Sequence, residues 1–145
     1  MARYSLSGRS GDDILKGRGG DDSLAGGYGD DTLIGGLGAD TLTGGEGNDV
    51  FKYNSLAELS GYTDTITDFA WGDKIDLSAI DANPQQTGDQ AFSLLGFQTD
   101  NSAFTGAGSE LYYSFDTLYG DVDGDRNPDF VIAVSGFLPD AGFIL

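Results

Sequence analysis

The stretch GRSGDDILK-GRGGDDSLA-GGYGDDTLI-GGLGADTLT-GGEGNDVFK, residues 8–52, decides the fold of this chain. It consists of five nine-residue units that follow one another without insertion or deletion. Every unit has glycine at its first and fourth positions, aspartate at its sixth and a large apolar residue at its eighth. A short motif repeated at a fixed period predicts a stacked architecture in which each unit packs on its neighbours.

The glycines predict a turn in every unit. Glycine adopts positive φ and allows close backbone approach, so we expect the first six residues to form a turn and the last three a very short strand. A turn that reverses the chain every nine residues closes one coil every eighteen. Residues eighteen apart then stack about 4.8 Å apart, which is the spacing of hydrogen-bonded strands. The predicted fold class is therefore all-β, a parallel β-roll.

The roll arranges the repeated side chains in rows. The aspartates form one row on each edge: Asp13, Asp31 and Asp49 on the first, Asp22 and Asp40 on the second. Because side chains alternate across a strand, the eighth residue of each unit points inward. The expected core is thin, with Leu15, Leu33 and Phe51 facing Leu24 and Leu42.

Stacked aspartates need a cation between them. Two carboxylates roughly 5 Å apart repel by about 3 kcal/mol at an effective dielectric constant of about 20. Calcium binds 6–8 oxygens at about 2.3–2.6 Å, so an ion midway between layers about 4.8 Å apart lies roughly one bond length from each. Magnesium, with shorter bonds and octahedral geometry, fits less well. The chain has no Cys and no His, which argues against zinc and copper.

The composition agrees with a cation-binding protein. The formal net charge is −17 over 145 residues, which disfavours nucleic acid and anionic membrane as partners. The acidic excess extends beyond the repeats into residues 53–145, where solubility explains much of it. No apolar run is long enough for membrane insertion, and residues 1–7 lack the apolar core of a signal peptide. The chain is therefore either excised from a longer protein or exported by another signal.

Residues 8–52 resemble the RTX repeats of proteins exported by type I secretion systems. The resemblance implies an ion held by the carbonyls of positions two and four and the aspartate of one turn, with the carbonyls of positions one and three and the aspartate eighteen residues on. Three complete sites follow. The first comprises Arg9, Gly11, Asp13, Gly26, Tyr28 and Asp31. The second comprises Arg18, Gly20, Asp22, Gly35, Leu37 and Asp40, and the third Gly27, Gly29, Asp31, Gly44, Glu46 and Asp49.

Two features of these sites follow from the use of backbone carbonyls. The third position varies freely among the units because only its carbonyl is needed. Arg9 and Arg18 replace glycine at position two, where the carbonyl is retained but the backbone angles are less free.

From residue 53 to 145 the regular repeat ends and a β-rich cap is expected. Alternation and β-branched or aromatic content predict strands over 64–69, 74–77, 91–95, 110–115, 117–122, 130–134 and 143–145. Single helical turns are expected over 55–59 and 78–81, the latter closed by Asn83 and Pro84. The end of a roll exposes unpaired strand edges and repeat arrays need caps, so residues 1–52 and 53–145 are the expected domains.

The cap contains the phrases DTITDFAWGDKIDLSAIDAN (64–83), GDQAFSLLG (88–96) and GDVDGDRNPDFVIAVSG (120–136). With the repeats, they resemble the C-terminal domain of serralysin-type metalloproteases over essentially the whole chain. Secreted lipases and mannuronan epimerases carry related modules. The resemblance implies a cap that contains an export signal at the extreme C-terminus. There, Ala141 and Gly142 separate the acidic Asp140 from the apolar residues Phe143, Ile144 and Leu145. The same residues could also form a final strand packed on the cap.

Two acidic groups in the cap are further calcium candidates. The segment Asp121, Asp123, Asp125, Asn127 and Asp129 alternates oxygen ligands around Gly124, like an EF-hand loop without its twelfth-position glutamate. The alternative is a solvated hairpin turn. Asp64 and Asp68 could complete a site with the turn that carries Gly36, Gly38 and Asp40.

The inventory of side chains argues against catalysis. Without histidine, the chain cannot form an HExxH zinc site or a Ser-His or Cys-His nucleophile. Paired carboxylates are abundant, but those of the repeats are assigned to metal.

The sequence therefore predicts a secreted, extracellular, calcium-folded module that assists the folding and export of an attached enzyme. At least three ions are expected in the roll and one or two more at the cap. The expected partners are the type I secretion apparatus and an N-terminal catalytic domain. A polysaccharide-binding accessory module and a calcium-dependent self-assembling protein are the alternatives.

Overall fold

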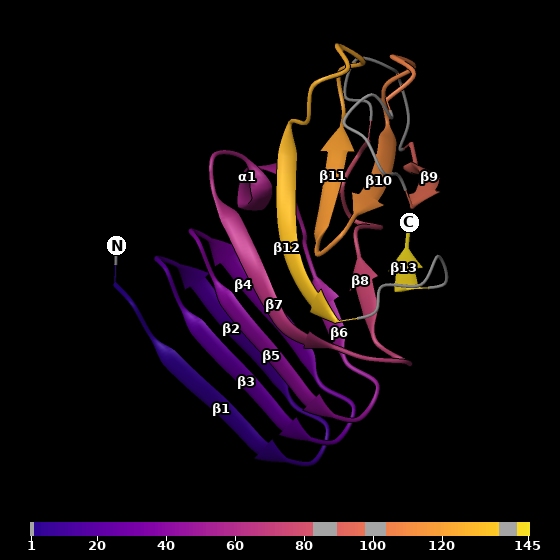
Figure 1. The fold of residues 1–145 in the computed structure, drawn as a ribbon. Coiled ribbons are helices and arrows are strands. Elements are labelled where there is room, and N and C mark those ends of the chain that lie inside the picture. Colours follow the sequence, from indigo (N-terminus) through magenta and orange to yellow (C-terminus); the bar gives the residue numbers. More distant parts are fainter. Residues whose placement is uncertain (1, 83–89, 98–103, 137–141) are drawn as a thin grey trace.

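The computed structural model describes residues 2–82, 90–97, 104–136 and 142–145. These residues form two sheets, one of eight strands in the order β1-β3-β5-β7-β12-β11-β10-β9 and one of five in the order β13-β8-β6-β4-β2. Figure 1 shows the strands of the roll stacked at the N-terminal end and the cap continuing the stack. The prediction of an all-β fold with a parallel β-roll is confirmed.

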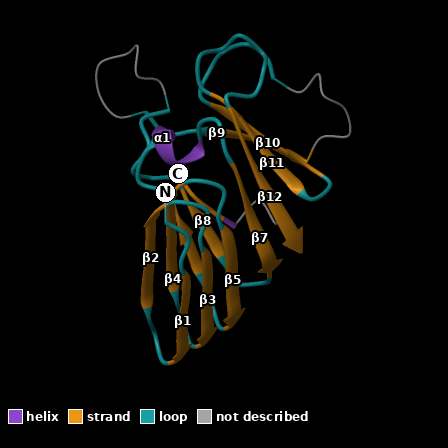
Figure 2. Cartoon of the chain, turned by 90° about the vertical axis from the view of Figure 1, so that its left-hand side faces the viewer, coloured by secondary structure: helices purple, strands orange, loops and turns teal. Residues whose placement is uncertain are grey.

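Consecutive roll strands alternate between the two sheets, as Figure 2 shows from the side. The strands are β1 (Ser5–Ser10), β2 (Ile14–Gly19), β3 (Ser23–Tyr28), β4 (Thr32–Leu37), β5 (Thr41–Glu46) and β6 (Val50–Lys52). Each pairs in parallel with the strand eighteen residues away, for example Leu15 with Leu33. One full coil therefore takes eighteen residues, as predicted.

The expected three-residue strands are wrong, because all roll strands except β6 have six residues. Pairing continues past the eighth and ninth positions into the first three residues of the next unit, as in Gly19 opposite Leu37. Gly27 in β3 has φ 121° and still pairs with Arg9. The positive φ at position two thus bends the strand without ending the ladder, and the turn shrinks to positions four to six.

The cap contains every predicted strand, with ends shifted by one or two residues. Its elements are α1 (Leu56–Leu59), β7 (Thr63–Phe69), β8 (Lys74–Asp76), β9 (Ser93–Phe97), β10 (Glu110–Ser114), β11 (Thr117–Asp121), β12 (Phe130–Gly136) and β13 (Phe143–Ile144). In place of the helical turn expected at 78–81, the chain forms a hydrogen-bonded turn over 77–80, closed by the Ile80 N–H donating to the Leu77 carbonyl (2.9 Å). Asn83, Pro84, Asp140 and Ala141 lie outside the described residues.

The two sheets run across the predicted boundary at residue 52. Strand β7 pairs with β5 and β8 pairs with β6, both in parallel. The step between paired residues is now 24, as in Thr41 opposite Thr65, and helix α1 lies in the added residues. Beyond β7, strands β12, β11 and β10 continue the larger sheet, and β11 pairs antiparallel with the neighbour on each side. The first part of the cap is thus a continuation of the roll.

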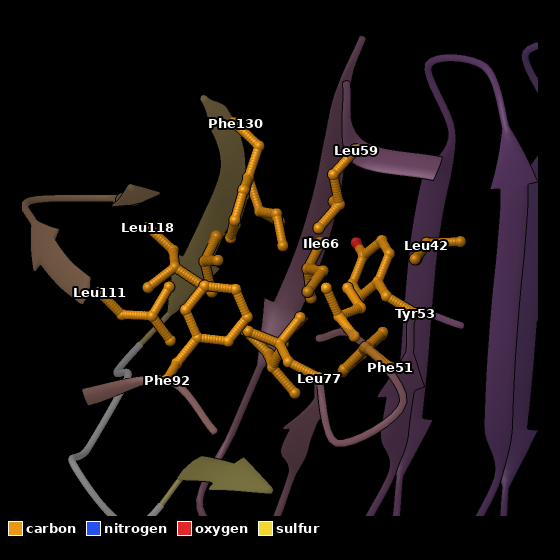
Figure 3. Close-up of a cluster of buried hydrophobic side chains, with 14 of the residues drawn as sticks. Leu42, Phe51, Tyr53, Leu59, Ile66, Leu77, Phe92, Leu111, Leu118 and Phe130 are labelled. Carbon is orange, nitrogen blue, oxygen red and sulfur yellow. The ribbon is translucent and has the colours of Figure 1, made fainter. Parts of the chain in front are cut away.

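One hydrophobic core connects roll and cap. The inward residues Leu24, Leu33, Leu42 and Phe51 are fully buried, and Leu15 is partly buried, as predicted. The same cluster continues into the cap through Ile66, Leu77, Phe92, Leu111, Leu118 and Phe130, shown in Figure 3.

The C-terminal residues form a strand. Phe143 pairs with Ile75, and the Leu77 N–H donates to the Ile144 carbonyl (2.9 Å). The final-strand alternative therefore holds for β13; whether these residues also serve in export stays a prediction. Among the described helices, none has the length and apolar character of a membrane span.

Candidate metal centre

The aspartates at position six link successive turns of the roll. In each row, one carboxylate oxygen accepts a hydrogen bond from the backbone N–H of the aspartate eighteen residues earlier. The Asp13 N–H donates to Asp31 Oδ1 (2.8 Å), and the Asp31 N–H to Asp49 Oδ1 (2.9 Å). On the other edge the Asp22 N–H donates to Asp40 Oδ1 (2.7 Å). The two predicted rows are confirmed, and the bonds fix the orientation of each carboxylate.

The second oxygen of these carboxylates is buried without a partner. This holds for Oδ2 of Asp13, Asp22, Asp31, Asp40, Asp49 and Asp64. A buried polar atom without a hydrogen bond is costly, and a buried negative charge without a counter-charge more so. The same defect at every layer indicates that a cation completes the fold there.

Backbone carbonyls converge on these oxygens at the position-one glycines. A Cβ placed on Gly26 would lie 2.3 Å from Asp31 Oδ2 and 2.6 Å from the Gly44 carbonyl oxygen. At Gly17, the corresponding atoms are Asp22 Oδ2 and the Gly35 carbonyl oxygen, each at 2.5 Å. The glycine thus leaves open a cradle that is lined by the carboxylate of its own unit and by a carbonyl eighteen residues on, the kinds of oxygen donor that calcium prefers.

The carbonyls of positions two and four face the following turn. A Cβ on Gly27 would lie 2.3 Å from the Arg9 oxygen, and one on Gly29 would lie 2.6 Å from the Gly11 oxygen. The same relation joins Gly36 to Arg18 and Gly38 to Gly20 at the second site, and Gly45 to Gly27 and Gly47 to Gly29 at the third.

The third position contributes only its carbonyl to this arrangement. The Gly11 N–H donates to the Tyr28 oxygen (2.8 Å), and the Tyr28 side chain is exposed. The carbonyls of Leu37 and Glu46 accept the corresponding bonds from Gly20 and Gly29. The structure therefore brings together the residues predicted for each of the three roll sites, and their oxygens fit calcium.

Arg9 and Arg18 adopt the backbone conformation of the glycines that they replace. Their φ values are 79° and 81°, in the left-handed region that costs a side-chain-bearing residue about 1–2 kcal/mol. Both carbonyls keep their orientation toward the next turn. The substitution thus preserves the oxygen donor at a cost in backbone strain.

Both aspartate rows continue into the cap. The Asp40 N–H donates to Asp64 Oδ1 (2.8 Å), and the Asp49 N–H to Asp73 Oδ1 (2.9 Å). Asp73 was not among the predicted site residues. A signal for it exists, because Asp64 and Asp73 are nine residues apart and each precedes an inward isoleucine by two positions. Asp73 closes its row differently, since its Oδ2 accepts from the Ala70 N–H (2.8 Å).

Asp68 does not share a site with Asp64, so the predicted grouping of both with Gly36, Gly38 and Asp40 is wrong for Asp68. Its two oxygens accept from the Gly44 and Gly45 N–H groups (2.9 Å each). Asp64 and Asp68 lie near opposite ends of β7. The alternation of side chains along a strand predicts which face each residue is on, but it does not predict which turn of the roll lies beside each end of the strand. Asp64 alone remains beside Asp40.

The position-five aspartates form a second ladder that the sequence interpretation missed. The Asp30 N–H donates to Asp12 Oδ1 (2.9 Å), and the Asn48 N–H to Asp30 Oδ1 (2.8 Å). These bonds run opposite to those of position six, because here the carboxylate accepts from the turn that follows. The bonds from Asn48 lower the pKa of Asp30, so this exposed carboxylate is stabilised in its ionised form by the turn that follows.

Burial makes the inner carboxylates reluctant to ionise. Desolvation raises the pKa of Asp49 to about 6 and that of Asp64 to about 7. It also raises the pKa values of Asp40 and Asp73, and neighbouring carboxylates add to the effect at Asp40. At neutral pH these groups are held in a medium that disfavours their charge, a situation that a bound dication reverses.

The acidic loop of the cap satisfies its own carboxylates. Oxygens of Asp121, Asp123 and Asp129 come within 4.8 Å of one another in the hairpin between β11 and β12, and this group does not include Asp125. The loop's own backbone supplies donors to it. Asp121 accepts from the Gly124 and Arg126 N–H groups, and Asp129 Oδ2 accepts from the Val122 N–H (2.6 Å). This arrangement supports the predicted hairpin turn, and ion binding there stays a prediction.

Stacked nonapeptide turns with two inward rows of aspartate define a β-roll repeat module with a β-rich cap. The chain belongs to the family described as Peptidase M10 serralysin C terminal, which matches residues 15–144. This bears out the predicted resemblance.

Among solved structures, the chain is similar to the AlgE6R3 subunit from the Azotobacter vinelandii mannuronan C5-epimerase. The identity is 26% and the TM-score 0.63, covering 97% of this chain and 78% of that one. Among curated protein sequences, none matches this chain significantly.

Proposed function

We propose that this chain is a calcium-binding, calcium-folded C-terminal module of a protein exported by a type I secretion apparatus. The observation that carries the proposal is the row of buried Oδ2 atoms without partners, one per turn. Calcium placed between turns would meet these oxygens together with the carbonyls that face them. Besides the three roll sites, Asp40 and Asp64 would hold a fourth ion, because both have an unpaired Oδ2.

Calcium would make folding depend on whether the chain is inside or outside the cell. Without the ion, carboxylate repulsion and the conformational entropy of a glycine-rich chain oppose folding, and an unfolded chain suits passage through a narrow channel. Extracellular calcium modules bind at about 10⁻⁴–10⁻³ M, and an ion that binds only the folded state stabilises it by mass action. The folded module would then stabilise, or help to fold, an attached N-terminal enzyme outside the cell.

The chain itself has a non-catalytic role in this proposal. It contains no histidine. Its inner carboxylates accept hydrogen bonds from the neighbouring coil with one oxygen, and the proposal assigns the other oxygen to calcium. Membership in a family described as the C-terminal part of serralysin supports an attached catalytic domain.

Circular dichroism during a calcium titration, with magnesium in parallel, tests the proposal. We expect a cooperative rise of β-sheet signal with calcium at submillimolar to millimolar concentration and no comparable rise with magnesium. The variant Asp31→Asn, which retains size but loses a shared charge, should need more calcium. A protein that keeps its full β-signal in excess chelator would contradict the proposal.

Polysaccharide binding is a second candidate function, favoured by the similarity to a subunit of a mannuronan epimerase. The net charge of −17 opposes an anionic glycan unless bound calcium or Arg3, Arg9 and Arg18 create a local positive strip. Arg3 is already paired with Asp21, which weakens that strip. Calorimetric titration with alginate in saturating calcium decides the matter: absence of binding heat removes this candidate.

A further inference from the structure

Tyr53 lies at the junction of roll and cap. It follows β6 directly, and its backbone N–H donates to the Asp76 carbonyl (3.0 Å). Its side chain is 1% exposed and belongs to the core cluster that also contains Leu59 and Ile66. Figure 3 places the ring between Ile66 and Leu42, with Leu59 nearby. The position of this phenol is therefore fixed by packing on all sides.

The hydroxyl of Tyr53 is buried without a hydrogen-bond partner. A buried tyrosine hydroxyl normally has one. Burial raises the pKa of Tyr53. The charge of Asp64 and a weak hydrogen-bond interaction between the Tyr53 hydroxyl and the Asp64 carboxylate add to the effect, as do the charges of Asp40 and Glu58. Asp64 is itself 1% exposed, and its Oδ2 also has no partner. The phenol and the carboxylate thus interact where the second aspartate row ends, without a hydrogen bond of ordinary length between them.

We propose that Tyr53 is a positioning residue for Asp64, whose carboxylate accepts the Tyr53 O–H when a calcium ion occupies the Asp40–Asp64 site. This inference rests on the proposed function. Asp64 Oδ1 already accepts the Asp40 N–H, so the Tyr53 hydroxyl completes the remaining capacity of a carboxylate that has about four lone-pair sites. A bond to an ionised carboxylate is stronger than a neutral one, and such outer-shell bonds orient metal ligands.

The consequence is a link between ion binding and the cap. The ring of Tyr53 packs in the shared core, and its hydroxyl interacts with the last carboxylate of the row. An ion at the Asp40–Asp64 site would keep Asp64 ionised and so strengthen this weak interaction into a full hydrogen bond. Occupancy of the last roll site would therefore favour the packed arrangement of the cap.

The variant Tyr53→Phe tests the inference because it removes the hydroxyl and keeps the ring. Removing an outer-shell partner typically weakens metal binding by 10- to 100-fold, so we expect about a tenfold loss of calcium affinity at one site, by competition with a chromophoric chelator. Stability in excess chelator should be nearly unchanged, since the variant then loses only a weakly bonded hydroxyl. Tyr62→Phe, with Tyr62 46% exposed, is the matched control and should leave both quantities unchanged.

A double-mutant cycle with Asp64→Asn makes the test specific. If Tyr53 acts through Asp64, Tyr53→Phe has no further effect on calcium affinity in the Asp64→Asn background. Equal loss of stability with and without calcium would show a packing role only and overturn the inference, as would an unchanged affinity in Tyr53→Phe. A wild-type protein that binds no calcium would instead refute the proposed function, so the two failures are distinguishable.

Discussion

Roll and cap bury their carboxylates in opposite ways. In the roll, Asp31 and Asp40 are each 1% exposed, and each has one oxygen bonded and one without any partner. In the cap, Asp121 is 0% exposed, but both its oxygens accept backbone N–H groups. The difference teaches that burial alone does not identify a metal ligand. The unmet second oxygen, repeated at every layer, distinguishes the two.

The two regions also differ in how much core each residue contributes. The roll buries one large apolar side chain per nine-residue unit, whereas the cap adds aromatic pairs such as Phe92 with Phe130, whose ring centroids are 5.9 Å apart. A thin aliphatic row offers little burial to offset the entropy of a glycine-rich chain. We therefore expect the roll to depend on bound ions and the cap on hydrophobic packing.

Removing calcium should affect the two regions unequally, and this is the largest expected effect. Each site filled at a free calcium concentration of about 100 times its Kd contributes about 2.7 kcal/mol, and a chelator removes all such terms together. Amide hydrogen exchange should then show lost protection at Asp13, Asp22 and Asp31, whose N–H groups depend on the aspartate rows. Strands β10 to β12 should keep more protection. Equal loss of amide protection in the roll and in the cap would show that the two regions do not differ in their dependence on calcium.

The sequence predicted the roll well because its restraints are local and periodic. The nine-residue period determines which residues stack, so the rows of Asp13 and Asp22 and the inward Leu24 and Leu33 could be placed without coordinates. The cap strands were found from alternation, but their pairing was not, since parallel partners such as β7 and β12 are far apart in sequence. Asp73 was missed because the added residues around α1 shift the stacking step from 18 to 24.

A carboxylate shared by two sites should matter more than one in the cap loop. With the rows extended, Asp40 would serve the sites of Asp22 and Asp64, as Asp31 serves those of Asp13 and Asp49. Asp40→Ala should lower the free energy of unfolding in calcium by about 3 kcal/mol or more, measured by urea unfolding. Asp123→Ala, at an exposed position of the cap loop, should change it by less than about 0.5 kcal/mol. Similar losses at both positions would place an essential ion in the cap as well.

Glycines in the two regions should respond differently to a methyl group. Gly26 does not have positive φ, but a Cβ there meets Asp31 Oδ2 and the Gly44 carbonyl, so Gly26→Ala fills the cradle. We expect a loss of about 2 kcal/mol in calcium, with weaker calcium binding. Gly61 in the cap has φ 81° and open space around it, so Gly61→Ala should lose about 1 kcal/mol from backbone strain alone. Thermal unfolding with and without calcium separates these causes, because only the Gly26 loss should depend on the ion.

The smallest expected effect is the dependence of stability on pH in the calcium-free protein. It also separates the inner carboxylates of the roll from the exposed ones. In the calcium-free protein, the pKa of Asp49 is raised from 3.8 to about 6 and that of Asp64 to about 7. The folded state therefore binds more protons than the unfolded state between these values, so stability falls as pH rises from about 4 to about 7. Below that window the effect reverses, because Asp21 and Asp30 have lowered pKa values and lose their favourable contacts on protonation.

Acid should therefore partly replace calcium. A chelated sample moved from pH 7.5 to about pH 5 should regain part of its β-sheet signal, since protons neutralise the same inner carboxylates that the ion would bind. Asp64→Asn mimics the protonated side chain and should reduce this response, while Asp123→Asn in the cap loop should not. A chelated protein whose β-signal falls steadily on acidification would show that the inner carboxylates are not the groups that keep the ion-free roll unfolded.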